Sequence, residues 1–277
     1  MGRDIKHMRD GVYRISDVES KEVKRISMGI EHLDNIYGGG LPRGRVSIWS
    51  GAPGVGKSRM TIEISKNMNN AGLRILVFQN EVSPSEFKNW ISGKINNENE
   101  YLVSNYSTIE EQIQALYDYA PDLVITDSLN MIQGFNNLTK IRDIMSKFKE
   151  AVSEINAHAI LIGHLGKDGK TKGSTDITHL VDVVCHIRMH SSWKEKIGRA
   201  TVTHAALPGI FYILVDKNRY GSSGGYVAFK HHSHGIAEVN SSIKDEVQND
   251  ISSSNEKENL LVKFFGGVLR YIEGQTG

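Results

Sequence analysis

The sequence predicts an α/β fold: a mostly parallel, twisted sheet with helices on both faces and antiparallel strands at one edge. Two observations predict it. Short β-branched runs alternate with helical patterns through the middle of the chain, which is typical of strand, helix, strand units. In the last third, three more such runs are separated by Gly- and Ser-containing turns, which favours antiparallel edge strands. In this class of sheet the chemistry lies at the carboxyl ends of the parallel strands.

The elements follow from the apolar runs in chain order. Buried parallel strands are expected at residues 45 to 50, 74 to 79, 122 to 127, 158 to 164 and 182 to 188. Helices are expected over roughly 57 to 70, 84 to 95, 108 to 118 and 138 to 156. The edge strands are expected at 211 to 216, 226 to 231 and 235 to 239.

One main domain is expected, at residues 26 to 240, with short flanking segments. Residues 1 to 25 form an N-terminal segment and are a candidate oligomerisation arm. Residues 241 to 259 are polar and are expected to be a linker. Residues 260 to 277 carry apolar positions at helical spacing, so they either dock on the core of the same chain or bind a protein partner.

Composition excludes several classes of protein. With 277 residues, 39% hydrophobic and 23% charged, the chain is typical of a soluble protein. It has no apolar stretch long enough to span a bilayer and no apolar signal core at its start, so a cytoplasmic location without membrane contact is expected. Cys185 is the only cysteine, which excludes an internal disulfide. The net charge of +1 neither requires nor excludes a nucleic-acid partner.

Residues 51 to 58 read Gly-Ala-Pro-Gly-Val-Gly-Lys-Ser, a complete G-x-x-x-x-G-K-S/T phosphate loop between an expected strand and an expected helix. Glycines let backbone N–H groups surround a polyphosphate at the positive end of a helix. Lys57 is expected to reach the β- and γ-phosphates and Ser58 to ligate Mg²⁺. The sequence therefore predicts binding of ATP with Mg²⁺. The expected ATP-binding residues are Gly51, Ala52, Pro53, Gly54, Val55, Gly56, Lys57, Ser58 and Arg59.

Hydrolysis also needs one carboxylate for the Mg²⁺ shell and another to orient or deprotonate water. Asp127 ends the run DLVITD and is assigned to the metal; the alternative is a strand-end Asp that caps a turn. Glu81 follows the run RILVFQ, on a strand expected to neighbour the phosphate loop, and is assigned as the water-activating base. Its competitor is Glu86, which follows Pro84 in a first helical turn, where the dipole alone favours acids.

Five motifs in order, over roughly residues 13 to 240, resemble the bacterial RadA (Sms) ATPase core. Before the phosphate loop stand the R-I-x-x-G-x-x-x-L-D and G-G-G-L-x-x-G elements. Residues 80 to 83 lie where that family carries G-E-E-S. Residues 162 to 169 are similar to its G-H-V-T-K-x-G, and residues 217 to 221, KNRYG, to its K-N-R-F-G. The chain has no four-cysteine zinc module, so a core-only relative is expected, similar in size to RecA-like phage recombinases.

The resemblance implies a RecA-like P-loop NTPase core that assembles as a homo-oligomer, in rings or filaments on DNA, with ATP between neighbouring subunits. On that model Lys217 and Arg219 reach across to the γ-phosphate of the next subunit and stabilise charge in the transition state. From the residues alone, KNRYG is also a plausible basic turn after a strand.

His164 closes the run HAILIGH at the same sheet edge as the acids. It is expected to sense the γ-phosphate and to signal to the next loop; the alternative is a satisfied surface group. That loop holds Lys167, Lys170 and Lys172, which suit phosphate contacts with single-stranded DNA, the alternative being a solvated loop. Trp193, among nearby cations, either stacks on a base or belongs to a surface hairpin.

The sequence therefore predicts a Mg²⁺- and ATP-dependent ATPase, stimulated by single-stranded DNA, that acts in recombination or repair. The alternatives are a DnaB-like replicative helicase motor and a non-catalytic, ATP-dependent oligomeric switch. KNRYG and the edge hairpins disfavour a small-molecule kinase.

Overall fold

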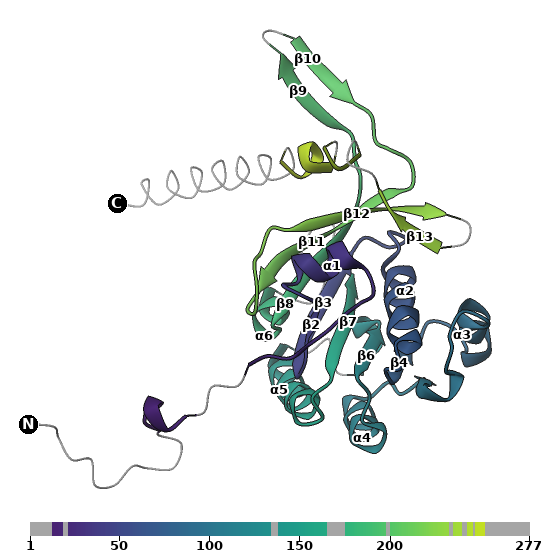
Figure 1. Ribbon diagram of the computed structural model, residues 1–277, viewed down its shortest axis with the longest axis vertical. Coiled ribbons are helices and arrows are strands. Elements are labelled where there is room, and N and C mark those ends of the chain that lie inside the picture. The colour runs from purple at the N-terminus through teal and green to yellow at the C-terminus, as the bar shows by residue number, and fades with distance from the viewer. Residues whose placement is uncertain are drawn as a thin grey trace, which may run out of the picture.

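The computed structural model describes residues 13–18, 22–133, 138–164, 175–197, 200–232, 235–239, 243–245 and 247–252. Within these residues, nine strands form one mixed sheet (Figure 1). Its spatial order is β13 (Gly235–Glu238), β12 (Tyr226–His232), β11 (Ile210–Asn218), β8 (Val183–Met189), β3 (Arg45–Gly51), β7 (His158–His164), β6 (Leu123–Asp127), β4 (Ile75–Gln79) and β5 (Tyr101–Ser104).

The six strands from β8 to β5 are parallel, and β11, β12 and β13 add to the β8 side in antiparallel pairs. The mixed sheet expected from the sequence is therefore confirmed. One expectation is wrong: β4 does not neighbour β3. Two strands, β7 and β6, lie between them, so the segment that follows β4 must reach back toward β3 to share a site with it.

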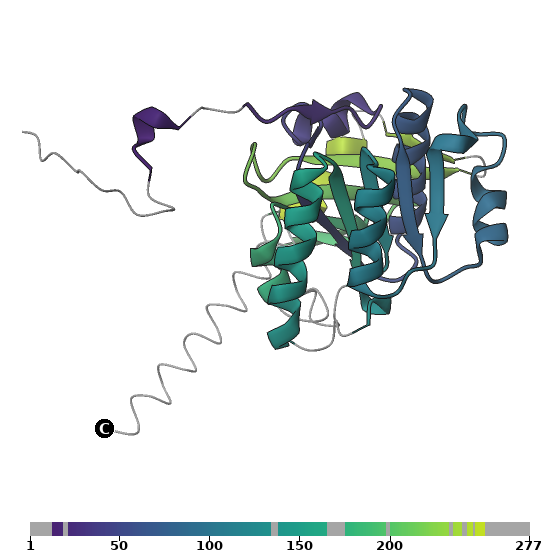
Figure 2. The ribbon, with the colours of Figure 1, turned by 90° about the horizontal axis from the view of Figure 1, so that it is seen from below.

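Helices cover both faces of the sheet (Figures 1 and 2). Met60 and Phe87 pack with Trp49 on one face, and Leu116 packs with Ile48 on the other. Trp49 and Ile48 are consecutive on β3, so their side chains point to opposite faces. The first layer contains α1 (Glu31–Ile36), α2 (Lys57–Asn70) and α3 (Pro84–Ile91), and the second α4 (Ile109–Tyr119), α5 (Leu138–Glu154) and α6 (Thr175–Leu180). No helix in the described residues is long and apolar enough to cross a bilayer.

Local chemistry sets the helix boundaries near the phosphate loop. The helix α2 begins at Lys57, directly after Gly56, and it covers the expected 57 to 70. The Ser83 hydroxyl accepts from the Glu86 N–H at the start of α3, and Pro84 stands at its first position, both typical of a helix N-terminus. The end of α3 at Ile91 is earlier than expected because Gly93 follows with φ of +69°, which stops the helix.

Several short elements lack a strong pattern in the sequence. They are β1 (Arg25–Ile26), β2 (Leu41–Pro42), β5, and the 3₁₀ turns η1 (Ile15–Asp17), η2 (Glu98–Glu100) and η3 (Leu129–Met131). A separate hairpin, β9 (Trp193–Ile197) with β10 (Ala200–His204), stands away from the main sheet (Figure 1). The Trp193 ring is 7% exposed and stacks on His204 at 3.8 Å between ring centroids, so its hairpin interpretation fits better than base stacking.

Part of the expected linker is packed structure. Residues 243–245 and 247–252 are helical, and Val247 and Ile251 are buried against Tyr212 of β11. The Asp250 carboxylate accepts hydrogen bonds from the Ser191 N–H at 3.1 Å and hydroxyl at 2.6 Å. The docking peptide expected at 260 to 277 lies outside the described residues.

Candidate nucleotide site

The phosphate loop connects β3 to α2, and two of its glycines are required by its geometry. Gly54 and Gly56 have φ of +75° and +101°, in the left-handed region that favours glycine. A Cβ at Gly56 would lie 2.5 Å from the His231 ring, and one at Gly51 would lie 2.4 Å from a backbone oxygen of Ile187. The loop can therefore curl tightly before the N-terminus of α2, where backbone N–H groups and the dipole attract anions.

Lys57 stands at the first position of α2 and is buried, with 5% of its surface exposed. Its Nζ donates to the carbonyl oxygens of Gly51 and Ala52, both at 2.9 Å. Burial lowers the pKa of the Lys57 ammonium, and the negative charges of Asp127 and Glu81 oppose that effect. The lysine of the loop is thus electrostatically coupled to both predicted acids.

Asp127 ends β6 and is 4% exposed. Burial raises the pKa of its carboxyl, and so does the charge of Glu81, whereas hydrogen bonds from Ser58 and Gln79 and the charge of Lys57 lower it. The Ser58 hydroxyl and the Asp127 carboxylate are therefore in direct contact. They are hard oxygen donors, the kind that Mg²⁺ prefers, so the residues present fit a magnesium ion beside the phosphates.

Glu81 follows β4 and is exposed, and its backbone N–H donates to Gln79 Oε1 at 2.7 Å. It lines a cavity of about 290 Å³ together with the loop and Asp127. The full lining is Pro53, Gly54, Gly56, Lys57, Ser58, Arg59, Glu81 and Asp127. Glu86 is not among these residues; it lies in the first turn of α3, where its backbone N–H donates to the Ser83 hydroxyl. Of the two competing acids, the fold thus brings Glu81 to the loop.

Two supporting residues were not assigned from the sequence. Gln79 is 3% exposed and forms hydrogen bonds with both the Glu81 backbone and the Asp127 carboxylate. A polar residue at the end of the apolar run RILVFQ was the sequence feature that could have indicated this role. His231 of β12 contacts the loop, with Nε2 at 3.4 Å from the Val55 carbonyl oxygen. Arg59 donates to the His232 carbonyl oxygen. The contact between β12 and the phosphate loop depends on the order of strands in the sheet, which local sequence patterns do not give.

The backbone of His164 pairs in parallel register with Gly51, so β7 ends beside the phosphate loop. The sensor role expected of the His164 side chain lies outside what the structure describes. The loop with Lys167, Lys170 and Lys172 also lies outside the described residues.

The structure separates Lys217 and Arg219 from the phosphate loop of their own chain. Asn218 pairs with Val183, which pairs with Ser47, so the end of β11 is level with the beginning of β3. At about 3.3 Å per residue, Ser47 lies roughly 13 Å before Gly51. The two cations therefore lie at the opposite edge of the sheet from the nucleotide cavity.

At that edge the cations are held by backbone carbonyls and by one buried acid. Lys217 Nζ donates to the Thr178 and Val181 carbonyl oxygens, both at 2.8 Å, and burial lowers the pKa of this amine, as does the charge of Arg219. The Arg219 side chain is 49% exposed and its Nη1 lies 3.4 Å from Asp182 Oδ1. Arg219 also lines a hollow of about 330 Å³ with Arg142 and Lys149. These three cations give the hollow a positive lining.

Comparisons with known proteins agree with this geometry. Residues 13–170, more than half of the chain, match the AAA_25 family, described as an AAA domain. The chain is 30% identical over 239 residues to the DNA repair protein RadA of Aquifex aeolicus, which covers 82% of this chain and 49% of the relative. For RadA of Mycobacterium tuberculosis (strain ATCC 25618 / H37Rv) the identity is 28% over 237 residues, with 82% and 46% covered. The chain thus spans about half the length of the curated relatives it matches.

Two solved structures share the fold. The flagellar accessory protein FlaH of Methanocaldococcus jannaschii superposes with a TM-score of 0.58 at 17% identity, covering 79% of this chain and 100% of that one. A KaiC-like protein of Pyrococcus horikoshii gives 0.57 at 18%, with the same coverage. The resemblance to RadA and the RecA-like fold expected from the motifs are confirmed. The chain belongs to the AAA_25 family of AAA domains and is a relative of the RadA proteins, with a RecA-like core.

Proposed function

We propose that this protein binds ATP with Mg²⁺ and hydrolyses it as a homo-oligomer that acts on single-stranded DNA in repair or recombination. The observation that carries the proposal is the convergence of Lys57, Ser58, Glu81 and Asp127 on one cavity at the carboxyl edge of the sheet. This set supplies a cation, a hydroxyl and two carboxylates beside a helix N-terminus, which are the parts that phosphoryl transfer requires.

Each group has a separate role. The backbone of the loop and the Lys57 ammonium hold the β- and γ-phosphates, and Ser58 and Asp127 would hold Mg²⁺. The bound ion neutralises charge on the phosphate oxygens. Glu81, exposed at the mouth of the cavity, accepts the proton of the attacking water. Asp127 is less suited to that role because it is buried and hydrogen-bonded to Ser58.

The cations Lys217 and Arg219 act on the nucleotide of a neighbouring copy. Their position at the far edge of the sheet supports this role, because they cannot reach the phosphates of their own chain without unpairing β11 from β8. The positive hollow around Arg219 is suited to receive a phosphate. A head-to-tail contact of this kind leads to a ring or a filament. Residues 13–18, in which Ile15 is 89% exposed, support the N-terminal segment as an oligomerisation arm.

The proposal that DNA is the polymer bound rests on two supports. Relatives that share 82% of this chain carry the name DNA repair protein RadA. The lysine-rich sequence between residues 165 and 174 follows β7, whose end lies beside the phosphate loop. DNA binding and the state of the nucleotide would then be coupled through the carboxyl end of β7.

The test is phosphate release by the full chain with MgATP, with and without a single-stranded oligonucleotide and over a range of salt. We expect hydrolysis that increases with the oligonucleotide, and an increase that salt removes because phosphate contacts are salt-dependent. A strand-displacement assay separates a helicase motor from an ATPase that only binds DNA. Binding of ATP without hydrolysis under all these conditions would contradict the proposal and favour the oligomeric switch.

A further inference from the structure

Two motifs that precede the phosphate loop in the sequence have no part in the nucleotide cavity. The R-I-x-x-G-x-x-x-L-D element begins at Arg25 and the G-G-G-L-x-x-G element at Gly38, whereas other residues line the cavity. A third motif, KNRYG at residues 217 to 221, lies far away in the sequence. The structure brings the three motifs together at the edge of the sheet opposite the cavity, where β11 ends.

Arg25 is the residue that joins these motifs. Its half-buried side chain leaves β1 and reaches two separate turns. The Arg25 Nη1 donates to the carbonyl oxygens of Tyr37, at 2.8 Å, and Gly40, at 3.0 Å. The Arg25 Nη2 donates to the carbonyl oxygen of Tyr220 in KNRYG. One guanidinium therefore connects the glycine turn before the phosphate loop to the turn that carries Arg219.

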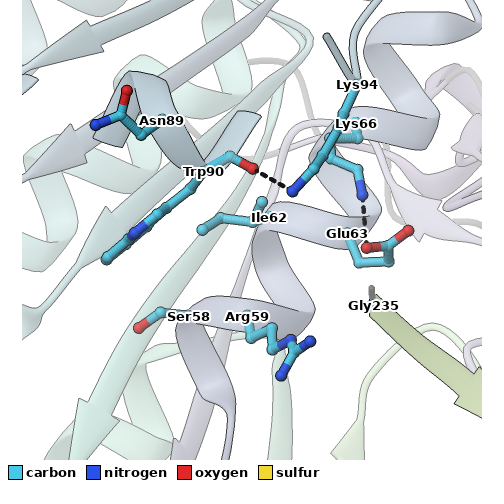
Figure 3. A pocket seen from close by; sticks show the side chains of 9 residues that line it. All are labelled: Ser58, Arg59, Ile62, Glu63, Lys66, Asn89, Trp90, Lys94 and Gly235. Atoms are coloured by element: carbon cyan, nitrogen blue, oxygen red, sulfur yellow. Dashed lines mark hydrogen bonds and ion pairs between the residues drawn. The ribbon is translucent and has the colours of Figure 1, made fainter. Parts of the chain in front are cut away.

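Three backbone acceptors at fixed positions suit an arginine better than a lysine. A guanidinium presents its N–H groups in a rigid planar fork, whereas an ammonium is a single charged point on a flexible stem. On α2, for example, the Lys66 ammonium pairs with one carboxylate oxygen of Glu63 at 2.6 Å (Figure 3). A lysine at position 25 would keep the positive charge but could not hold both turns in the same geometry.

The glycine turn is a firm support for this contact. Tyr37 is fully buried, and its hydroxyl accepts a hydrogen bond from the Trp49 indole at 2.6 Å, so the turn is attached to the core beneath the sheet. Residues 38–40 then all have positive φ, which glycine adopts without strain. A Cβ at Gly40 would lie 2.4 Å from a backbone oxygen of β1. The turn can therefore fold closely around the Arg25 side chain.

Within KNRYG, the residues beside the two cations form the other half of the contact. The Asn218 amide donates to the Tyr37 carbonyl oxygen at 3.3 Å, and its Oδ1 accepts from the Tyr220 N–H at 3.0 Å. A Cβ at Gly221 would lie 3.1 Å from the same Tyr37 oxygen, so a side chain there would crowd the contact. The motif thus combines cations with residues that attach their turn to the core.

We propose that Arg25 is a positioning residue for Arg219, and that it sets where this cation stands when it faces the nucleotide of a neighbouring copy. The inference rests on the proposed function, because it assumes that Arg219 acts between copies. The Arg219 side chain is 49% exposed, so the backbone of its turn determines its position. The Arg219 N–H donates to the Asp182 carbonyl oxygen at 3.1 Å on one side of that turn, and Arg25 holds the other side.

The first test is Arg25→Lys in the full chain, with turnover measured by phosphate release and MgATP affinity by calorimetry. We expect turnover to fall by about 100-fold, which a displacement of about 1 Å can produce, while MgATP affinity stays at the wild-type value. Arg43→Lys is the matched control, because the Arg43 guanidinium bonds instead to the Asn156 carbonyl oxygen at 3.1 Å and to Asp122 at 2.7 Å. It should keep wild-type turnover.

Two outcomes of this test would overturn the inference. Wild-type turnover of Arg25→Lys would mean that the guanidinium does not position Arg219. A parallel loss of MgATP affinity would mean that Arg25 supports the phosphate loop of its own chain. Gly221→Ala provides a second variant if Arg25→Lys does not fold, because it crowds the same contact from an exposed position. It should also lower turnover without changing affinity, and wild-type turnover of this variant would contradict the proposal.

Mixed chains show whether the defect lies in the copy that lends the cation. Arg25→Lys chains keep an intact phosphate loop, so mixing and reassembling them with Lys57→Ala chains should recover activity. The reference is the same mixture made with Arg219→Ala. Recovery with Arg219→Ala but not with Arg25→Lys would overturn the inference and leave the proposed function standing. No recovery in either mixture would reject the role of Arg219 between copies, and the inference with it.

A double variant gives a readout that a general loss of stability would not reproduce. If Arg25 acts through Arg219, adding Arg25→Lys to Arg219→Ala should lower turnover no further, because the cation to be positioned is already gone. Independent effects would instead multiply the two losses. A double variant about 100-fold less active than Arg219→Ala alone would mean that Arg25 acts through another group, and would overturn the inference.

Discussion

The parallel strands of the central sheet end on two sides, and these sides carry different charges. The side with the carboxyl ends is called the carboxyl edge, and the side with the amino ends is called the far edge. At the carboxyl edge, a lysine, a serine and two acids from three successive segments meet around one cavity. At the opposite edge, the cations Lys149, Lys217 and Arg219 lie near a single buried carboxylate, Asp182. The carboxyl edge holds most of the groups that a polyphosphate site needs. The far edge instead carries more cations than carboxylates, next to a hollow.

This difference shows which parts of the chemistry one chain can assemble alone. The strands of one chain converge at the phosphate loop because they are parallel and end at the same edge. β11 runs the other way, so the residues at its end must lie at the far edge. A site that needs both edges can therefore be completed only when a second copy presents its far edge to the loop.

The largest expected effect is at the carboxyl edge. Lys57→Ala removes the buried ammonium that is coupled to both acids, so we expect loss of MgATP binding and no turnover above background, measured by phosphate release and calorimetry. Lys147→Ala is the control, because that side chain is 63% exposed and forms an ion pair with Asp143 on the surface of α5. Turnover by Lys57→Ala near the wild-type rate would mean that the cavity is not the catalytic site.

Arg219→Ala tests the far edge. Loss of a cation that stabilises the transition state from a neighbour is expected to lower turnover by about 1,000-fold with little change in ATP affinity, because the binding groups of the same chain are untouched. Equal amounts of Arg219→Ala and Lys57→Ala chains, mixed and reassembled, should recover activity, since about one interface in four then joins an intact loop to an intact arginine. If the mixture stays as inactive as its components, the cation does not act between copies.

Most of the carboxyl edge was predictable from local patterns. The phosphate loop is complete in the sequence, Glu81 directly follows one apolar run and Asp127 ends another. Each of these patterns is local, and the structure brings Lys57, Ser58, Glu81 and Asp127 together. The spatial order of the strands was not predictable in this way. β4 lies two strands from β3, because sequence patterns give the type of a strand and not its neighbour.

The remaining differences have the same origin. The contacts of His231 with the loop depend on the β12 edge hairpin packing beside α2, and residues 247–252 pack because Val247 and Ile251 find an apolar surface on β11 and β12. The sequence around Val247 and Ile251 is polar, so their burial could not be predicted from composition. The far-edge position of Lys217 and Arg219 follows from the antiparallel direction of β11, which the sequence did predict, together with its pairing to β8, which it did not.

Glu81→Gln separates the chemical step from binding within the carboxyl edge. The amide keeps the size and the polar contacts of the side chain but cannot accept a proton, so hydrolysis should fall by about 100-fold while ATP affinity stays near the wild-type value. Glu86→Gln is the matched control, because it changes an exposed acid of α3 outside the cavity and should keep wild-type turnover. The reverse pattern, with Glu86→Gln impaired and Glu81→Gln active, would transfer the base to α3.

The smallest effect concerns the stability of the nucleotide-free fold. Burial raises the pKa of Asp127, so folding favours its protonated form, and the stability that this group contributes is present below the ordinary Asp pKa and is lost as pH rises through the raised value. Asp127→Asn keeps the shape without the charge. We expect its Tm at neutral pH to exceed that of the wild type by about 2–4 °C, the shift that ~1 kcal/mol produces in a chain of this size.

Two further measurements connect this gain to function. The difference in Tm should shrink as the pH falls through the raised pKa of Asp127 and should be gone below the ordinary Asp pKa of about 3.9, where the carboxyl is neutral in the folded and unfolded wild type, and added MgATP should raise the Tm of the wild type much more than that of Asp127→Asn. Asp143→Asn, which alters a 67% exposed carboxylate on α5, should show neither effect. A Tm of Asp127→Asn below the wild-type value at neutral pH would mean that the ionised carboxylate stabilises the fold. Binding of Mg²⁺ would then not relieve any destabilisation caused by the buried charge of Asp127.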